Sequence, residues 1–158
     1  MIRQRARAVR FAVAALAAVT LVVGWILVRD WLELPGVPAD VVRSVESKQV
    51  HILAEGSGAS PGNDWENSYA LISVSSQDDP VEDIEAALRS AGWTTRPGVS
   101  DPLLLAGDFS RENPQYGVTV QTYENFDCLD QSGVCGTFEK SAEGQGQNLF
   151  VATFMPYV

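Results

Sequence analysis

The hydrophobic residues of this chain follow two different patterns. Phe11–Val28 (FAVAALAAVTLVVGWILV) is a run of eighteen residues without a charge, flanked by Arg10 and Arg29. As a helix it spans about 27 Å, close to the ~30 Å hydrocarbon core of a bilayer. Beyond it, apolar residues come in short segments with helix or strand periods. The pattern predicts four parts: a basic segment (1–10), a transmembrane anchor helix (11–28), a tether (29–48) and a folded domain (49–158).

A cleaved signal peptide is the alternative to an anchor. The apolar part of a signal peptide is usually about 7–15 residues long, and a small-residue cleavage site follows it closely. The one acceptable site, Val37–Ala39, lies beyond the charged residues Arg29, Asp30 and Glu33. The sequence therefore favours an uncleaved anchor, with the lipid bilayer as the partner of residues 11–28.

Several segments after the anchor are typical of strands, because their apolar residues alternate or occupy both faces. Asn148–Met155 would place apolar residues on both faces of a strand, which favours a central position in the sheet. Leu103–Ala106 fits a strand or a helix, and the Gly- and Ser-rich Glu55–Asn63 is predicted to be a loop. The remaining predicted strands are Val50–Ala54, Ser68–Ser75, a short one near Trp93–Arg96, and Tyr116–Tyr123.

One helix has clear start and stop signals. Asp79 is a favourable N-cap, Pro80 takes the first helical position and Glu82 completes a capping-box variant. Gly92, with Trp93 after it, fits a Schellman stop. A short helix is also expected over Ala39–Ser47.

The order of these elements predicts an α+β fold. A mostly antiparallel sheet is expected, covered by one main helix. About 24 residues separate the last two predicted strands, which is long for a loop without structure. A helical turn near Gly136–Ala142 is compatible with the sequence there.

Charge adds an orientation to this layout. Of the 11 basic residues in the 158-residue chain, four precede the apolar run, and no acidic residue comes before Asp30. By the positive-inside bias, the N-terminus is expected in the cytoplasm and the C-terminal domain outside the plasma membrane. The chain has a formal net charge of −9. Nucleic acid is therefore not an expected partner of this acidic domain.

The two cysteines agree with an exported domain. Cys128 and Cys135 are separated by six residues, a spacing that fits neither a C-x-x-C redox motif nor a four-ligand zinc site. A disulfide is the natural interpretation in an oxidising compartment, and two reduced thiols are the alternative.

The sequence offers little for catalysis or metal binding. The single histidine, His51, lies in a predicted strand, and no Gly-x-Ser-x-Gly or Ser-x-x-Lys pattern accompanies it. We predict no catalytic residue, no metal site and no cofactor. Two oxygen-rich loops lack the spacing of a calcium loop and are interpreted as solvated. Their residues are Asn63, Asp64, Glu66 and Asn67 in one, and Glu124, Asp127, Asp130 and Glu139 in the other.

The leading hypothesis is a non-enzymatic, membrane-anchored module that binds a protein or another cell-envelope partner. Trp65 is a possible contact, because a large indole in a polar loop either caps the core or offers a surface to a partner. Two alternatives remain: a small cell-envelope hydrolase that uses a pair of carboxylates, or a sensor of a small ligand.

Overall fold

The computed structural model describes residues 18–25, 35–59, 64–76, 78–110, 115–127, 132–146 and 148–157. The chain divides into two compact units, Met1–Leu34 and Pro35–Val158. In the first unit, residues 18–25 are helical and exposed, and the rest of the predicted anchor 11–28 lies outside the described residues. None of the helices among the described residues combines the length and the apolar character that a membrane crossing requires.

The second unit is an α+β fold built on an antiparallel sheet, as the sequence predicts. Its six strands have the order β1-β2-β6-β5-β4-β3, and every neighbouring pair is antiparallel. Strand β6 lies inside the sheet between β2 and β5, which confirms the central position expected for its doubly apolar sequence. The strands are β1 (Val50–Ala59), β2 (Glu66–Val74), β3 (Thr94–Pro97), β4 (Leu103–Ser110), β5 (Gln115–Thr122) and β6 (Leu149–Tyr157).

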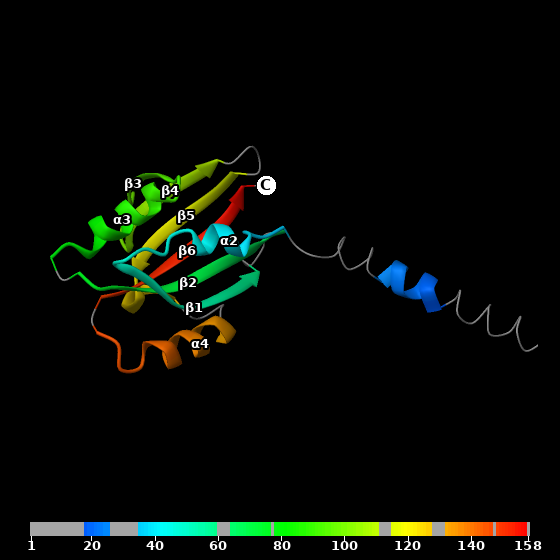
Figure 1. Cartoon of the computed structure of the whole chain (residues 1–158). Coiled ribbons are helices and arrows are strands. Elements are labelled where there is room, and N and C mark those ends of the chain that lie inside the picture. Colours follow the sequence, from blue (N-terminus) through cyan, green and yellow to red (C-terminus); the bar gives the residue numbers. More distant parts are fainter. Residues whose placement is uncertain are drawn as a thin grey trace, which may run out of the picture. The chain divides into compact units, whose positions relative to one another are not determined.

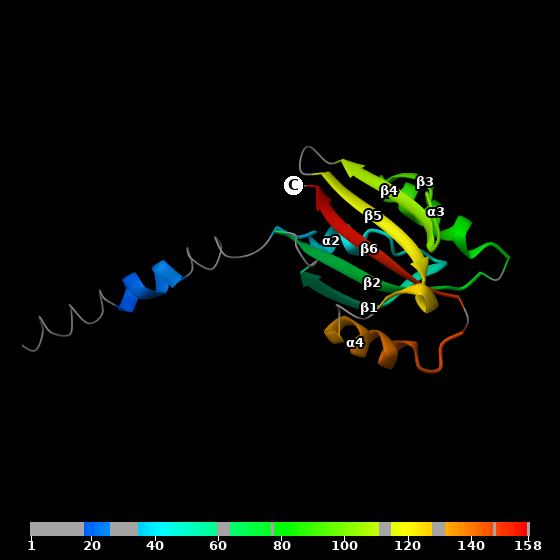
Figure 2. The same cartoon turned by 180° about the vertical axis from the view of Figure 1, so that it is seen from behind.

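Helices lie on both faces of the sheet, whereas the sequence predicts one main helix. The helices α2 (Ala39–Arg43) and α3 (Pro80–Ser90) lie over one face (Figure 1). Helix α4 (Ser132–Ala142) lies on the opposite side, next to β1 (Figure 2). The sequence indicates only a turn within α4, because Gly133 and Gly136 lower the helix propensity of this segment. Burial of Val134 and Phe138 against the sheet stabilises the helix.

The boundaries of α3 follow from its own sequence and confirm the predicted caps. The Asp79 Oδ1 atom accepts a hydrogen bond from the Glu82 amide at 3.0 Å. At the other end, the Trp93 amide donates to the Leu88 carbonyl at 3.0 Å, and Gly92 has a φ of 96°. These are the bond and the left-handed residue of a Schellman motif. The stop turns the Trp93 indole into the core, where its ring centroid lies 5.0 Å from that of Phe109.

One predicted boundary is wrong. Strand β1 continues to Ala59 through a segment that the sequence assigns to a loop. Gly56 allows close packing there, because a Cβ on this residue would lie 3.0 Å from the Val134 Cγ2 atom of α4. The second compact unit of the structure begins at Pro35. The later half of the predicted tether belongs to the core through four buried valines: Val37, Val41, Val42 and Val45.

Candidate interaction surface

The side of the sheet that carries α4 is only partly covered. Helix α4 packs mainly on β1, and its residues Val134 and Phe138 reach Tyr69, Leu71 and Val151. Among the described residues, no helix lies over β3, β4 and β5 on this side (Figure 2). We call this uncovered part the open face.

Strand register identifies the side chains of the open face. Val151 of β6 points toward α4, so alternation places Thr153, Met155 and Tyr157 on the same side. Thr153 is opposite Thr119 and Met155 is opposite Gly117. Extending this register across the sheet gives the members of the open face: Thr94, Arg96, Leu103, Ala106, Asp108, Gly117, Thr119, Gln121, Thr153, Met155 and Tyr157.

Three of these residues form a polar cluster across strands β3, β4 and β6. The Tyr157 hydroxyl donates to the Asp108 Oδ1 atom at 2.7 Å, and the Arg96 guanidinium is paired with Oδ2. The hydrogen bond from Tyr157 holds the pKa of Asp108 below its usual value; burial opposes this shift and Arg96 adds to it. The same hydrogen bond raises the pKa of the Tyr157 hydroxyl. Among the side chains that the structure describes on the open face, only Arg96 and Asp108 are charged, and their charges cancel.

The Tyr157 side chain packs against the backbone of Gly117. A Cβ on Gly117 would be 2.5 Å from the Tyr157 hydroxyl oxygen, so a larger residue at this position of β5 would displace the tyrosine ring. A lone glycine in an alternating strand often marks such a close approach. The sequence therefore contains a signal for this contact, but it does not identify the ring that occupies the space.

A buried polar group lies beside the open face. Asn67 of β2 is 8% exposed, and its Oδ1 atom has no hydrogen-bond partner. Its Nδ2 atom makes one long contact of 3.5 Å with the Tyr69 hydroxyl. Asn67 shares the side of Tyr69 by alternation, so it borders Met155 on the sheet. Buried amide oxygens are rarely left unpaired in native proteins.

The other candidates from the sequence do not come together into one site. Trp65 is half-buried in the bend before β2 and belongs to neither core cluster, so its role as a contact stays a prediction. His51 is exposed in β1 opposite Ser73. Of the two oxygen-rich groups, Asn63 and Asp130 lie outside the described residues. In the part of the chain that the structure describes, no three His, Cys, Asp or Glu residues are placed to hold a metal ion.

Glu66 and Glu139, which belong to these oxygen-rich groups, interact with neighbouring residues. Glu66 accepts a hydrogen bond from the Ser57 hydroxyl at 2.8 Å. Glu139 lies near the Tyr123 hydroxyl, whose pKa is raised first by burial and then by this negative charge.

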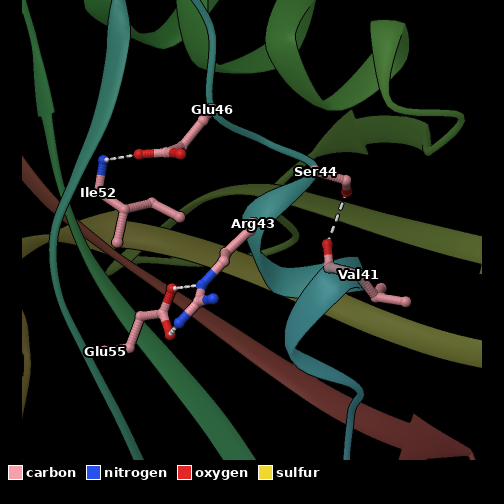
Figure 3. Close-up of polar contacts among 6 residues, drawn as sticks. All are labelled: Val41, Arg43, Ser44, Glu46, Ile52 and Glu55. Carbon is pink, nitrogen blue, oxygen red and sulfur yellow. Dashed lines mark hydrogen bonds and ion pairs between the residues drawn. The ribbon is translucent and has the colours of Figure 1, made fainter.

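Two small hollows each contain a single carboxylate. One, of about 260 Å³, is lined by α2, β1 and β2 and includes Glu55. Both oxygens of Glu55 bind the Arg43 guanidinium, at 2.8 and 3.0 Å (Figure 3). The other, of about 280 Å³, lies beside the β5–β6 end of the sheet and includes Glu124. Both volumes are below the 300–1,000 Å³ usual for small-molecule sites.

The cysteine prediction falls partly within the structure. Cys135 lies in α4, is 5% exposed and is disulfide-bonded. Cys128 lies outside the described residues, so its pairing with Cys135 stays a prediction.

Comparisons with family models, with curated proteins and with solved structures found no match for this chain. A functional conclusion therefore rests on the residues of the chain itself. The feature that requires an explanation is the open face, a broad sheet surface beside a helix that covers only its edge.

Proposed function

We propose that this protein is a single-pass, membrane-anchored interaction module without catalytic activity, and that the open face is its contact surface. In this proposal residues 11–28 cross the plasma membrane, the N-terminus is cytoplasmic and the α+β domain is outside. Support for the topology comes from the length of the uncharged run and from the four arginines before it. The proposed Cys128–Cys135 disulfide agrees with an oxidising compartment.

The open face is the single observation that carries the proposed binding function. Residues 35–158 contain 18 acidic and 6 basic side chains, whereas the open face has one of each, paired with each other. Its middle consists of uncharged residues on β5 and β6, partly accessible to solvent: Thr119, Gln121, Thr153 and Met155. Depletion of unpaired charge in the middle, with a polar rim, is the usual anatomy of a protein interface.

Catalysis by a pair of carboxylates has less support. Glycoside hydrolysis requires two carboxyl groups about 5–10 Å apart around a bound substrate. Each of the two hollows lined by described residues has one carboxylate, and that of Glu55 is held by Arg43. A binding function, in contrast, requires no second carboxylate, and the open face offers a surface for it.

The topology is tested with reporters fused to the full chain. A reporter active only outside the cytoplasm is expected to be active after Val158 and inactive before Met1. Changing the four N-terminal arginines to Glu is expected to weaken or invert the orientation. The opposite reporter pattern in the unmodified protein contradicts the proposal. The arginines are Arg3, Arg5, Arg7 and Arg10.

The contact surface is tested by proximity labelling in intact cells, with the labelling enzyme fused to the full chain. Thr119→Arg places a charge in the middle of the open face. Ala86→Arg places the same charge on the exposed side of α3. Loss of specifically labelled neighbours in the first variant alone is the expected result. Unchanged labelling in Thr119→Arg removes the open face from the proposal.

A further inference from the structure

The charge of the folded unit restricts how two copies can meet. Residues 35–158 have an excess of twelve negative charges, from 18 acidic and 6 basic residues. Three arginines of the described part already pair with carboxylates of the same chain: Arg43 with Glu55, Arg89 with Glu85 and Arg96 with Asp108. Two such domains therefore repel each other wherever their acidic surfaces approach.

The open face is the exception to this repulsion. Among the described residues its two charges, Arg96 and Asp108, form an ion pair, and Asp108 also accepts a hydrogen bond from Tyr157. Between this cluster and α4 the surface consists of uncharged threonine, glutamine and methionine side chains. Thr119 and Thr153, directly opposite each other on β5 and β6, lie near its middle. A second copy can approach here without bringing like charges together.

The surface of a sheet can pack against the same surface of a second copy. Two sheets pack face to face about 10 Å apart, with strand directions within about 30° of each other. A two-fold axis through the middle of the open face makes the same patch available on both partners. The face spans the four strands β3, β4, β5 and β6, roughly 19 Å at ~4.8 Å per strand. The eight residues of β4 or β5 extend about 26 Å at ~3.3 Å per residue, so the face measures roughly 500 Å². This area is less than the ~800 Å² per partner of a stable soluble complex, so we expect association that depends on confinement in one membrane.

We infer that the partner of the open face is a second copy of this chain, anchored in the same membrane, with the two exported domains paired sheet to sheet. The inference rests on the proposed function, since it names the partner of the same surface. It also predicts an unusual salt dependence. Screening weakens the repulsion between two acidic domains, so pairing strengthens as salt rises, whereas binding of a basic partner weakens.

The test is energy transfer between full-length chains labelled at the N-terminus with a donor or an acceptor, in vesicles of phosphatidylcholine. Salt is raised from about 10 to about 150 mM, which shortens the Debye length from about 30 to about 8 Å. We expect the wild type to associate, and to associate more strongly at the higher salt concentration. An excess of unlabelled wild-type chain should lower the signal.

The variants separate contact through the open face from a general charge effect. Thr119→Arg and Ala86→Arg make the same reduction in net negative charge. Thr119→Arg is expected to weaken association at least about tenfold, because like charges then meet across the interface. Ala86→Arg should keep or slightly strengthen it. A mixture of Thr119→Arg and Thr119→Glu chains should restore pairing, and circular dichroism checks that each variant is folded.

The outcomes distinguish the inference from the proposed function. Absence of wild-type association at both salt concentrations overturns self-pairing, as does equal association of wild type and Thr119→Arg. If proximity labelling still depends on Thr119 in that case, the open face binds a different partner and the proposed function stands. If that labelling is also unaffected by Thr119→Arg, both fail.

Discussion

The two faces of the sheet are made by the same strands but are covered very differently. On one face α2 and α3 close over a continuous cluster of twenty buried residues, which includes the fully buried Phe154. On the other face a cluster of five buried residues joins α4 to β2 and β6, and no helix among the described residues covers the remainder of the sheet. Burial of apolar area is the main stabilising contribution to folding, so the first face supplies most of the stability. The second face is thereby free to present uncharged polar side chains.

The largest expected effect is on the helix-covered face. Phe154→Ala removes a ring that is 0% exposed and lies 5.7 Å from the Trp93 ring, between centroids. We expect a loss of about 3–5 kcal/mol in the free energy of unfolding, because the surrounding core collapses only partly into the cavity. Denaturant unfolding of the full chain measures it. A loss below about 1 kcal/mol contradicts the assignment of the main core to this face.

The matching change on the other face is Phe138→Ala in α4. This ring is also 0% exposed, but its cluster is small and local. We expect a smaller loss, about 2–3 kcal/mol, with increased amide hydrogen exchange concentrated in α4. Equal exchange throughout the sheet would show that the two faces unfold together and would remove the difference between them.

Removal of the predicted disulfide tests whether the α4 side of the sheet is stabilised independently of the other face. Replacement of Cys128 and Cys135 by Ala is expected to cost about 2.5 kcal/mol, the chain-entropy value for an eight-residue loop. The loosening should be confined to the segment around α4, since Cys135 belongs to that helix. Two free thiols by alkylation of the unreduced, exported protein would contradict the pairing.

The cap of α3 gives a smaller and local effect. Asp79→Ala removes the acceptor of the Glu82 amide and should cost about 1 kcal/mol. Asp78→Ala, next to the cap and exposed, is the matched control and should change stability by less than about 0.5 kcal/mol. Both are measured by denaturant unfolding. Equal losses in the two variants would show that the cap contributes nothing.

The smallest effect comes from the cluster on the open face. The pKa of Asp108 is lower in the folded protein, so its stabilising contribution is present above the unfolded value of about 3.9 and is lost as pH falls through the folded pKa. Its carboxylate is 44% exposed, so the contribution should be less than about 1 kcal/mol. The stability difference between wild type and Asp108→Asn, by denaturant unfolding, should therefore shrink as the pH falls below the unfolded value and disappear once the folded carboxyl group is protonated. A difference that persists there would exclude this cause.

Local signals in the sequence predicted much of the helix-covered face. Asp79, Pro80 and Gly92 set the ends of α3 through a side-chain cap and the backbone conformations they favour, and apolar residues on both faces of β6 indicate its central position. Such features depend on residues close in the chain, so they can be derived without the fold.

The open face could not be predicted in the same way, because it depends on pairing between distant strands. The register of β4 on β5 includes an irregularity between Leu103 and Leu105, which alternation alone does not predict. The contact of Tyr157 with Gly117 and Asp108 joins residues up to 49 positions apart. Extension of β1 through Gly56 likewise depends on α4, which sequence propensity disfavours.

The central claim, that the open face is the contact surface, is tested most directly by photocrosslinking in intact cells. A photoreactive amino acid is placed at Thr119 on the open face or at Ala86 on the exposed side of α3, in the otherwise unmodified full chain. We predict a discrete covalent adduct from position 119 and none from position 86. Adducts from position 86 but not from position 119 would contradict the claim.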